Sequence, residues 1–298
     1  MKKHPLYRKT LSCLLAAAMI AILAASAMAG DLAEVKKSGV LRHLGIPYAN
    51  FVTGAGDGLD VELMKLFAQH LKVKYQFVKT DWKHVIGDLS GKVVKTKGAK
   101  VTIVGKCPVK GDVIANGLTI LGWRQKIINF SKPTFPTQVW LIAPANSPVQ
   151  PIKPTGDINK DIMLTKAALK GRKVFDKPNT CLDATLYNLS KAGAKTINFP
   201  AGLNDMAPAV IKGEADMTLL DVPDALVALE KWPQKLKVIG PLSEQQGMGV
   251  GFAKSSPELR KAFETFMAKC WQDGTYVKLV KKYYPAVFAY YGEFFKSK

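Results

Sequence analysis

Apolar and polar positions along the chain follow two periods, one typical of strands and one typical of helices. Residues 72–77 alternate between apolar and polar side chains, which predicts a half-buried strand. Residues 82–89 repeat apolar side chains at helical spacing behind a capping Asp81, and residues 112–115 and 139–143 form buried-strand runs. The second half repeats this rhythm, with strands expected at 173–175, 196–199, 217–220 and 236–239, and helices opening near residues 180, 204, 222 and 256.

Alternation of strands and helices predicts an α/β protein whose mostly parallel sheets are flanked by helices. Periodicity is lost twice, in the proline-rich stretch 144–154 and again in residues 239–252. We expect these stretches to be two crossings between lobes. Lobe 1 would then contain residues 30–142 and 244–298, and lobe 2 would contain residues 143–243.

The first 29 residues have the pattern of an export leader rather than of a folded element. A basic stretch ending at Lys9 precedes an apolar run over residues 11–25, and Ala27-Met28-Ala29 matches the small-x-small pattern of signal-peptidase sites. The alternative, a retained membrane anchor, is disfavoured because the run is shorter than the ~20 residues that span a bilayer. The sequence therefore predicts a soluble, exported protein that begins at Gly30.

The chain is strongly basic, with 43 Lys and Arg against 23 Asp and Glu. The lysines are scattered singly and in pairs, without a recognition-helix pattern or an aromatic-interleaved basic stripe. Since an exported protein rarely meets DNA, we expect no nucleic-acid partner. A solvated basic surface is the default reading, with contact to an acidic partner or a membrane surface as the alternative.

Cysteine and histidine offer little material for a metal or catalytic site. Three cysteines follow the leader, Cys107, Cys181 and Cys270, which allow at most one internal disulfide. No Cys or His spacing is typical of a metal site. The sequence predicts no metal and no cofactor.

Five segments follow one another in a recognisable order along residues 32–285. They are residues 35–42, residues 58–63, residues 111–120 with Arg124 and residues 129–131, residues 213–216 with Asp221, and residues 273–276. Together they resemble the periplasmic polar-amino-acid-binding proteins. The resemblance implies a two-lobed, hinged periplasmic receptor without catalytic residues. It also implies a monomer that binds an amino acid or a similar small zwitterion and delivers it to the membrane permease of an ABC importer.

The resemblance also assigns the two ends of the ligand. In the family, the arginine matching Arg124 grips the ligand carboxylate, for which a guanidinium fork is suited, and Thr119 donates a further bond. Gly117, in the same segment, is counted with the site. Asp221 would pair with the ligand ammonium, and the alternative role, capping the helix that begins at Val222, is compatible with it because two carboxylate oxygens accept several bonds.

Aromatic and turn residues complete the predicted site. Tyr48 and Trp82 resemble aromatic residues that cover the ligand side chain from opposite walls, although core packing explains each equally well. Thr180 matches a turn that finishes the carboxylate site, or simply caps its own helix. Ile46 stands where receptors for basic amino acids often carry an acid, which favours a neutral or aromatic ligand side chain.

Two alternatives remain open at the level of sequence. The first is an exported dehydratase that acts on a prephenate-like carboxylate, with Arg124 for binding and Glu244 as the general acid. The second is a solute-sensing module. Two segments depart from the family: residues 91–110 are an insertion with a predicted hairpin, and the aromatic tail 283–295 predicts a packed terminal helix or an exposed docking patch.

Overall fold

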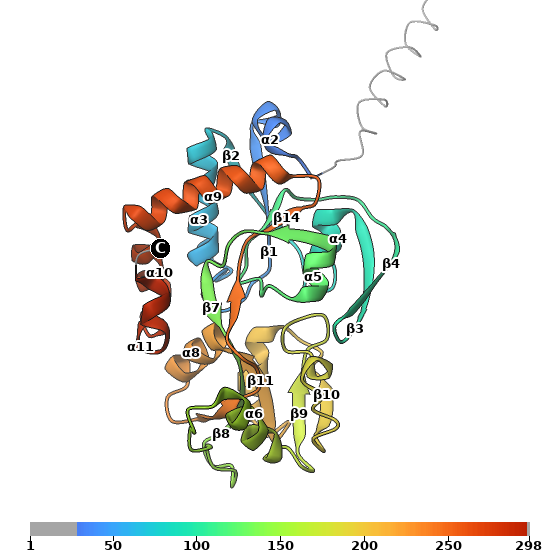
Figure 1. Ribbon diagram of the computed structural model, residues 1–298, viewed down its shortest axis with the longest axis vertical. Coiled ribbons are helices and arrows are strands. Elements are labelled where there is room, and N and C mark those ends of the chain that lie inside the picture. Colours follow the sequence, from blue (N-terminus) through green and yellow to red (C-terminus); the bar gives the residue numbers. More distant parts are fainter. Residues whose placement is uncertain (1–28, 297–298) are drawn as a thin grey trace, which may run out of the picture.

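The computed structural model describes residues 29–296 and shows two lobes, each built on a five-stranded mixed sheet (Figure 1). The predicted two-lobed α/β fold is confirmed. Apart from Ala29, the predicted leader lies outside the described residues. Within these residues, no helix is both long enough and apolar enough to cross a membrane.

The first lobe combines segments from both ends of the chain. Its sheet has the order β2-β1-β5-β14-β6, in which β1 runs parallel to β2 and β5, and β14 runs antiparallel to β5 and β6. The strands are β1 (Val40–Gly45), β2 (Lys74–Lys79), β5 (Val113–Ile114), β6 (Ile128–Phe130) and β14 (Gly251–Ala253), and the helices are α2 (Leu32–Ser38), α3 (Leu59–Leu71), α4 (Val85–Ser90), α5 (Gly122–Ile127), α9 (Pro257–Gln272) and α10 (Thr275–Tyr283).

The second lobe is formed by the middle of the chain. Its sheet has the order β10-β9-β11-β8-β12, with parallel pairing on one side of β11 and antiparallel pairing on the other. The strands are β8 (Val139–Pro144), β9 (Lys173–Asp176), β10 (Lys195–Asn198), β11 (Met217–Asp221) and β12 (Leu236–Pro241), and the helical segments are α6 (Ile158–Ala167), η1 (Ala184–Tyr187), η2 (Leu203–Asp205), α7 (Met206–Ile211) and α8 (Val222–Lys231).

Both sheets are mostly parallel, as the sequence predicted, because four of the five strands in each run in the same direction. The exceptions that make the sheets mixed are β8 and β14, each of which follows a crossing and enters its sheet against the direction of its neighbours. Hydrophobic runs reveal that a strand is buried but not in which direction it runs, because parallel and antiparallel buried strands have the same apolar content.

The crossings are two short strands, β7 (Phe135–Thr137) and β13 (Gln246–Met248), which pair antiparallel with each other. The prediction that residues 144–154 cross between the lobes is wrong. Ala145 donates its amide to Lys235 O and Ile152 donates to Ile239 O, so this stretch follows β12 within the second lobe. All of β8 belongs to the second sheet, which therefore begins at residue 139 rather than at the expected 143.

The insertion forms the predicted hairpin, and the aromatic tail packs onto the body. Strands β3 (Lys92–Lys97) and β4 (Lys100–Lys106) make a separate antiparallel sheet beside the first lobe, with its tip toward the second lobe (Figure 1). In the tail, α11 (Val287–Tyr291) and η3 (Gly292–Phe295) bury Phe295, whose ring lies 5.7 Å from that of Phe135 on β7. The tail thus supports a crossing strand.

Candidate functional site

Arg124 and Asp221, predicted to hold the two ends of a ligand, lie buried at the seam between the lobes. Arg124 belongs to α5 of the first lobe and Asp221 ends β11 of the second, and each is 1% exposed. Each also reaches the opposite lobe. Arg124 Nη2 donates to the Asn179 carbonyl at 3.1 Å, and the Tyr48 hydroxyl donates to the Asp221 carboxylate. The two lobes are therefore closed on each other.

The guanidinium of Arg124 is held by backbone carbonyls and aromatic rings. Nη1 donates to Thr119 O at 2.9 Å, and the group lies 5.8 Å from the Trp82 ring and 5.3 Å from the Trp123 ring. Nε is buried without a hydrogen-bond partner. Among the ion pairs of residues 29–296, none involves Arg124. Burial lowers the pKa of Arg124 to about 10, so the group remains a cation at neutral pH.

The Asp221 carboxylate caps α8, which is one of the two roles considered from the sequence. It accepts the Asp224 amide at 3.3 Å, and it faces the seam, where the Cys181 thiol lies 3.5 Å from Oδ2. Burial raises the pKa of Asp221 to about 6, against the opposing effect of the Tyr48 hydrogen bond. Asp224, one turn along, is also buried, and its pKa is raised well above the usual value by burial and by Asp221.

Gly117 contributes backbone geometry to the site. Its φ of 65° lies in the left-handed region, and an added Cβ would lie 2.5 Å from the Phe51 ring. Its amide donates to Asp60 Oδ2 at 2.7 Å. Burial raises the pKa of Asp60 to about 7, partly offset by this bond. The contact fixes the turn that carries Thr119, whose carbonyl in turn holds Arg124.

The two aromatic residues predicted to cover the ligand touch each other in this closed form. The rings of Tyr48 and Trp82 lie 5.6 Å apart and nearly perpendicular, rather than on opposite walls of an open space. Tyr48 is buried at the seam, whereas Trp82 is partly buried and its Nε1 has no hydrogen-bond partner.

Thr180 stabilises its own turn. Its hydroxyl donates to Lys177 O at 2.8 Å and accepts the Leu182 amide at 3.0 Å. The helix expected to open there is the single 3₁₀ turn η1, and its cap is Asp183. The prediction of a helix opening at Thr180 is therefore wrong, because a turn-forming hydroxyl satisfies local amides in the same way as a helix cap does.

Two cavities adjoin the seam on the side of Trp82. One of about 480 Å³ lies between the lobes, and one of about 270 Å³ lies under the hairpin. Trp82, Lys83 and Asn179 contribute to both, whereas Arg124 and Asp221 line neither of the two. The larger cavity is lined by Ile46, Pro47 and residues 81–83 of the first lobe, and by residues 177–179, Asn198 and residues 200–203 of the second.

Two neighbouring residues, Asn179 and Cys181, matter more than the sequence indicated. Asn179 has a φ of 67°, which aims its carbonyl at Arg124, and its side chain accepts the Thr96 hydroxyl of the hairpin at 2.7 Å. The buried Cys181 thiol contacts both Asp221 and the Thr119 side chain. In the sequence, the Asn-Thr-Cys turn is visible as a departure from the family pattern. Asparagine tolerates the left-handed backbone region better than most residues, and this was the signal that could have indicated the role of Asn179.

The described residues offer neither a general acid at these cavities nor a metal cluster. Glu244, the general acid of the dehydratase alternative, is exposed just before β13 and lines neither cavity. Cys107, Cys181 and Cys270 are free thiols. In residues 29–296, no group of three or more His, Cys, Asp or Glu side chains is placed to hold a metal ion.

The two-lobed fold, with Arg124 and Asp221 buried at the seam from opposite lobes, is that of a solute-binding protein. Residues 109–286 match the family model for bacterial extracellular solute-binding proteins, family 3, and the chain belongs to that family. It is 26% identical over 243 residues to the lysine/arginine/ornithine-binding periplasmic protein of Escherichia coli K12. The aligned region covers 79% of this chain and 81% of that protein.

Solved structures show the same fold. A mutant of ArgBP from T. maritima has a TM-score of 0.67 at 22% identity, covering 85% of this chain and 99% of that one. The ancestral amino acid-binding protein AncCDT-1, described as a precursor of cyclohexadienyl dehydratase, has a TM-score of 0.65 at 24% identity, covering 85% and 98%. By their names, these three similar proteins are binding proteins, in agreement with the prediction of a non-enzymatic receptor.

Proposed function

We propose that this protein binds a free amino acid, or a similar small zwitterion, between its lobes and delivers it to an ABC importer. The observation that carries the proposal is the cross-lobe arrangement of Arg124 and Asp221, which present opposite charges from opposite lobes. The localisation that fits this role is the periplasm, after export by a leader cleaved between Ala29 and Gly30.

Without ligand, the closed seam leaves both charged groups poorly compensated. Burial lowers the pKa of Arg124 and raises the pKa of Asp221, so each charged form is disfavoured there. A ligand carboxylate would take the place of the carbonyls now bonded to Arg124 and could also reach its unpaired Nε. A ligand ammonium would take the place of the Tyr48 hydroxyl on Asp221. A zwitterion thereby stabilises the closed lobes, which is a ligand-driven population shift.

The cavity beside Trp82 suits a neutral or aromatic side chain. Ile46 and Leu203 supply apolar surface from the two lobes, and the charged residues around it include Lys83 and Lys177. Lys177 Nζ already donates to the Phe199 and Ala201 carbonyls. Asp81, the acid of this cavity, is engaged by His84. A cationic ligand side chain would therefore meet two lysines and one acid that already has a partner.

A thermal-shift screen of the twenty amino acids, followed by calorimetry, tests the proposal. We expect stabilisation by one or more neutral or aromatic amino acids. Arg124→Ala should weaken binding at least about 100-fold, since a charge-assisted bidentate contact contributes about 3 kcal/mol. Arg172→Ala, a control at the far end of β9, should bind normally. Unchanged affinity in Arg124→Ala would refute the carboxylate assignment.

Delivery and catalysis are tested separately. Uptake of the bound amino acid by cells that lack this chain should fall relative to wild type and recover when the chain is restored. Incubation with a prephenate-like carboxylate should give no product, since Glu244 is exposed and lines neither cavity. Turnover that is lost in Glu244→Gln would favour the dehydratase instead. Normal uptake without the chain, despite tight binding, would favour a sensing role.

A further inference from the structure

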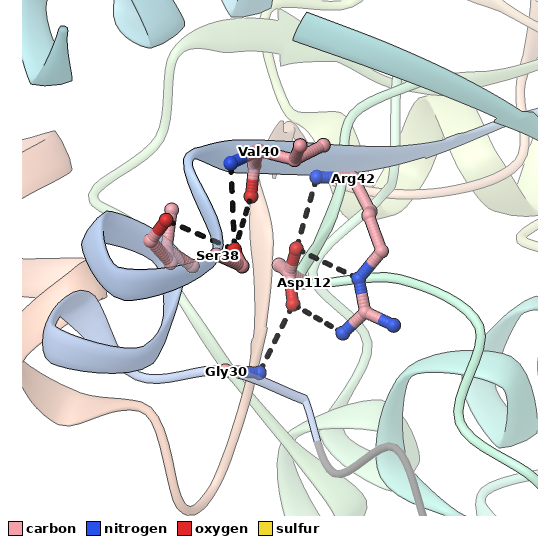
Figure 2. Close-up of polar contacts among 6 residues, drawn as sticks. Gly30, Ser38, Val40, Arg42 and Asp112 are labelled. Atoms are coloured by element: carbon pink, nitrogen blue, oxygen red, sulfur yellow. Dashed lines mark hydrogen bonds and ion pairs between the residues drawn. The ribbon is translucent and has the colours of Figure 1, made fainter. Parts of the chain in front are cut away.

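Gly30, which follows the proposed cleavage site, is hydrogen-bonded to a buried carboxylate. Gly30 N donates to Asp112 Oδ1 at 3.0 Å, a contact between residues 82 positions apart in the chain. Figure 2 shows the Asp112 carboxylate between Gly30 and Arg42, with bonds to both. Gly30, as the first residue of the processed chain, would thus lie in contact with the Asp112 carboxylate of the first lobe.

Asp112 is held rigidly in position to receive this group. Its side chain is 2% exposed, and its Oδ1 forms an ion pair with Arg42 Nη2 at 2.6 Å. Oδ2 accepts the Arg42 amide at 2.9 Å and Arg42 Nε at 3.1 Å, while the Asp112 amide donates to Arg42 O at 2.9 Å. The carboxylate therefore lies at a fixed place where β1 and β5 meet.

The chain around Gly30 is also tightly fitted. A Cβ at this position would lie 3.2 Å from Val35 Cγ2 and 3.3 Å from Asp112 Oδ1, so there is little room for a side chain. The next residue, Asp31, caps α2 by accepting the Leu32 amide at 2.9 Å, and it also accepts the Leu259 amide at the start of α9 at 2.7 Å. Residues 30 and 31 thus join two helices and the sheet.

The charged side chains that surround Gly30, from all the elements packed there, are mostly acidic. Asp112 lies under Gly30, and a cavity of about 880 Å³ around Gly30 is lined by Asp31, Glu34 and Lys36 from α2 and its cap and by Glu258 from α9. Arg42 of β1 and Lys36 are the cations. Four carboxylates against two cations leave an excess of negative charge, which suits a further cation.

We propose that Asp112 is the binding site for the α-ammonium of Gly30, which leader cleavage creates. The inference rests on the proposed cleavage after Ala29, and it is independent of the ligand. Hydrolysis of the Ala29–Gly30 peptide bond replaces a neutral amide donor by an ammonium, so the bond to the carboxylate then joins two opposite charges. Removal of the leader thereby completes an ion pair that stabilises the first lobe.

The ion pair predicts a defined dependence on pH. The α-amine of an unfolded chain has a pKa of about 7.7–8.0, and pairing with Asp112 raises it in the folded state. The stabilisation is fully present below the unfolded pKa and is lost as pH rises through the higher folded pKa. Between these two pKa values the contribution declines progressively.

The test compares three chains that differ only at the N-terminus. One begins with free Gly30, one with N-acetylated Gly30, and one with Ala29, which keeps the Gly30 amide but moves the charge outward by one residue. Below pH 8, we expect the free Gly30 chain to unfold about 2–4 °C above the acetylated chain, with the difference disappearing above the folded pKa. NMR of the ¹³C-dimethylated amine should give a pKa about one unit above the usual α-amine value.

Controls separate the ion pair from a general terminal effect. In Asp112→Asn, acetylation should no longer change the melting temperature, and if that variant does not fold, the comparison with the Ala29 chain still tests the proposal. Identical pH profiles for the three chains, together with an ordinary amine pKa, would overturn it. Mass spectrometry of the exported protein must give Gly30 as the first residue, and another N-terminus would overturn the proposal without affecting ligand binding.

Discussion

The Tyr48 hydroxyl and the Asp221 carboxylate form a contact between the lobes that a ligand ammonium would have to replace. Tyr48 is buried in the first lobe, and its ring contacts both Phe51 and Trp82. Its pKa is raised well above the usual value by burial and by Asp221, so the phenol remains protonated and donates. At the scale of single residues, the Tyr48 hydroxyl is therefore placed to compete with a ligand ammonium for Asp221.

Removing this competitor should strengthen binding. Tyr48→Phe keeps the ring but loses the hydroxyl, so the ligand ammonium would meet an Asp221 oxygen without a prior partner. We expect the affinity to rise about 3- to 10-fold, which corresponds to one net hydrogen bond. Calorimetry with the best ligand from the screen measures this. Tyr75→Phe, in which the lost hydroxyl contacts His43 away from the seam, is the matched control. A Tyr48→Phe chain that binds more weakly would show that Tyr48 assists the ligand.

At the scale of elements, the short turn after β5 is built around Gly117 and supports the position of Arg124. The Gly117 amide is fixed by Asp60 at the start of α3, and the carbonyl of Thr119, two residues on, accepts from Arg124. Helix α3 is in turn packed by Phe67 against Phe263 and Phe266 of α9, with ring distances of 5.2 and 5.3 Å. The arginine therefore depends on a helix far from it in sequence.

A methyl group at this turn should be costly. In Gly117→Ala, the left-handed φ and the 2.5 Å approach to Phe51 both oppose the Cβ. We expect the free energy of unfolding to fall by about 1–3 kcal/mol. Gly122→Ala is the matched control, since a Cβ there meets nothing within 4 Å. Denaturant unfolding of both chains gives the comparison, and equal loss in the two would contradict the assigned role of the turn.

The β3–β4 hairpin links the lobes through one hydrogen bond, from Thr96 to Asn179 at 2.7 Å. Thr96→Val keeps the shape of the side chain and removes this bond. We expect the ligand to dissociate about 2- to 10-fold faster, because the closed form loses about 0.5–1.5 kcal/mol. Thr102→Val, on the exposed strand β4 of the same hairpin, should leave the rate unchanged. Stopped-flow release measures both rates, and equal rates for the two variants would exclude a closing role for the hairpin.

At the scale of the whole molecule, closure brings acidic groups out of water. Asp221 and Asp224 are buried at the seam, where the pKa of Asp221 is raised to about 6. Tyr48, Cys181 and Arg124 oppose this rise in the pKa of Asp221, and Tyr187 and Tyr284 also lie within electrostatic reach of it. Burial of an ionised carboxylate opposes closure, so the ligand-free lobes should open as these acids ionise.

The position of this equilibrium should depend on pH. With a pKa near 3.9 in the open form and about 6 in the closed form, Asp221 favours closure fully below about pH 4, and this effect is lost as pH rises through 6. We expect the ratio of closed to open apo protein to fall about 10- to 100-fold over that range. Small-angle scattering from pH 4 to pH 8 follows the radius of gyration. Asp221→Asn should flatten the profile, leaving the contribution of Asp224, and an identical profile in the variant would contradict the assignment.

Much of this molecule could be predicted from the order of its residues. The strand runs at 217–220 and 173–175 and the capped helix at Val222 appear where periodicity and capping predict them. Helix α9 also begins at Pro257 as expected, but its first amides are accepted by the distant Asp31 and not by the Ser256 side chain. These signals are local, since each depends on side chains within a few positions of one another. Arg124 and Asp221 were assigned instead from the resemblance of short motifs to a known family, and those motifs are equally local in the sequence.

Only the tertiary structure decided how distant parts meet. The antiparallel direction of β8 and the path of residues 144–154 along β12 depend on contacts with strands elsewhere in the chain. The contacts of Tyr48 with Asp221 and of Gly30 with Asp112 join residues 173 and 82 positions apart. Neighbouring side chains encode the conformation of a segment, but the energy of burying a charge depends on which groups the complete fold brings beside it.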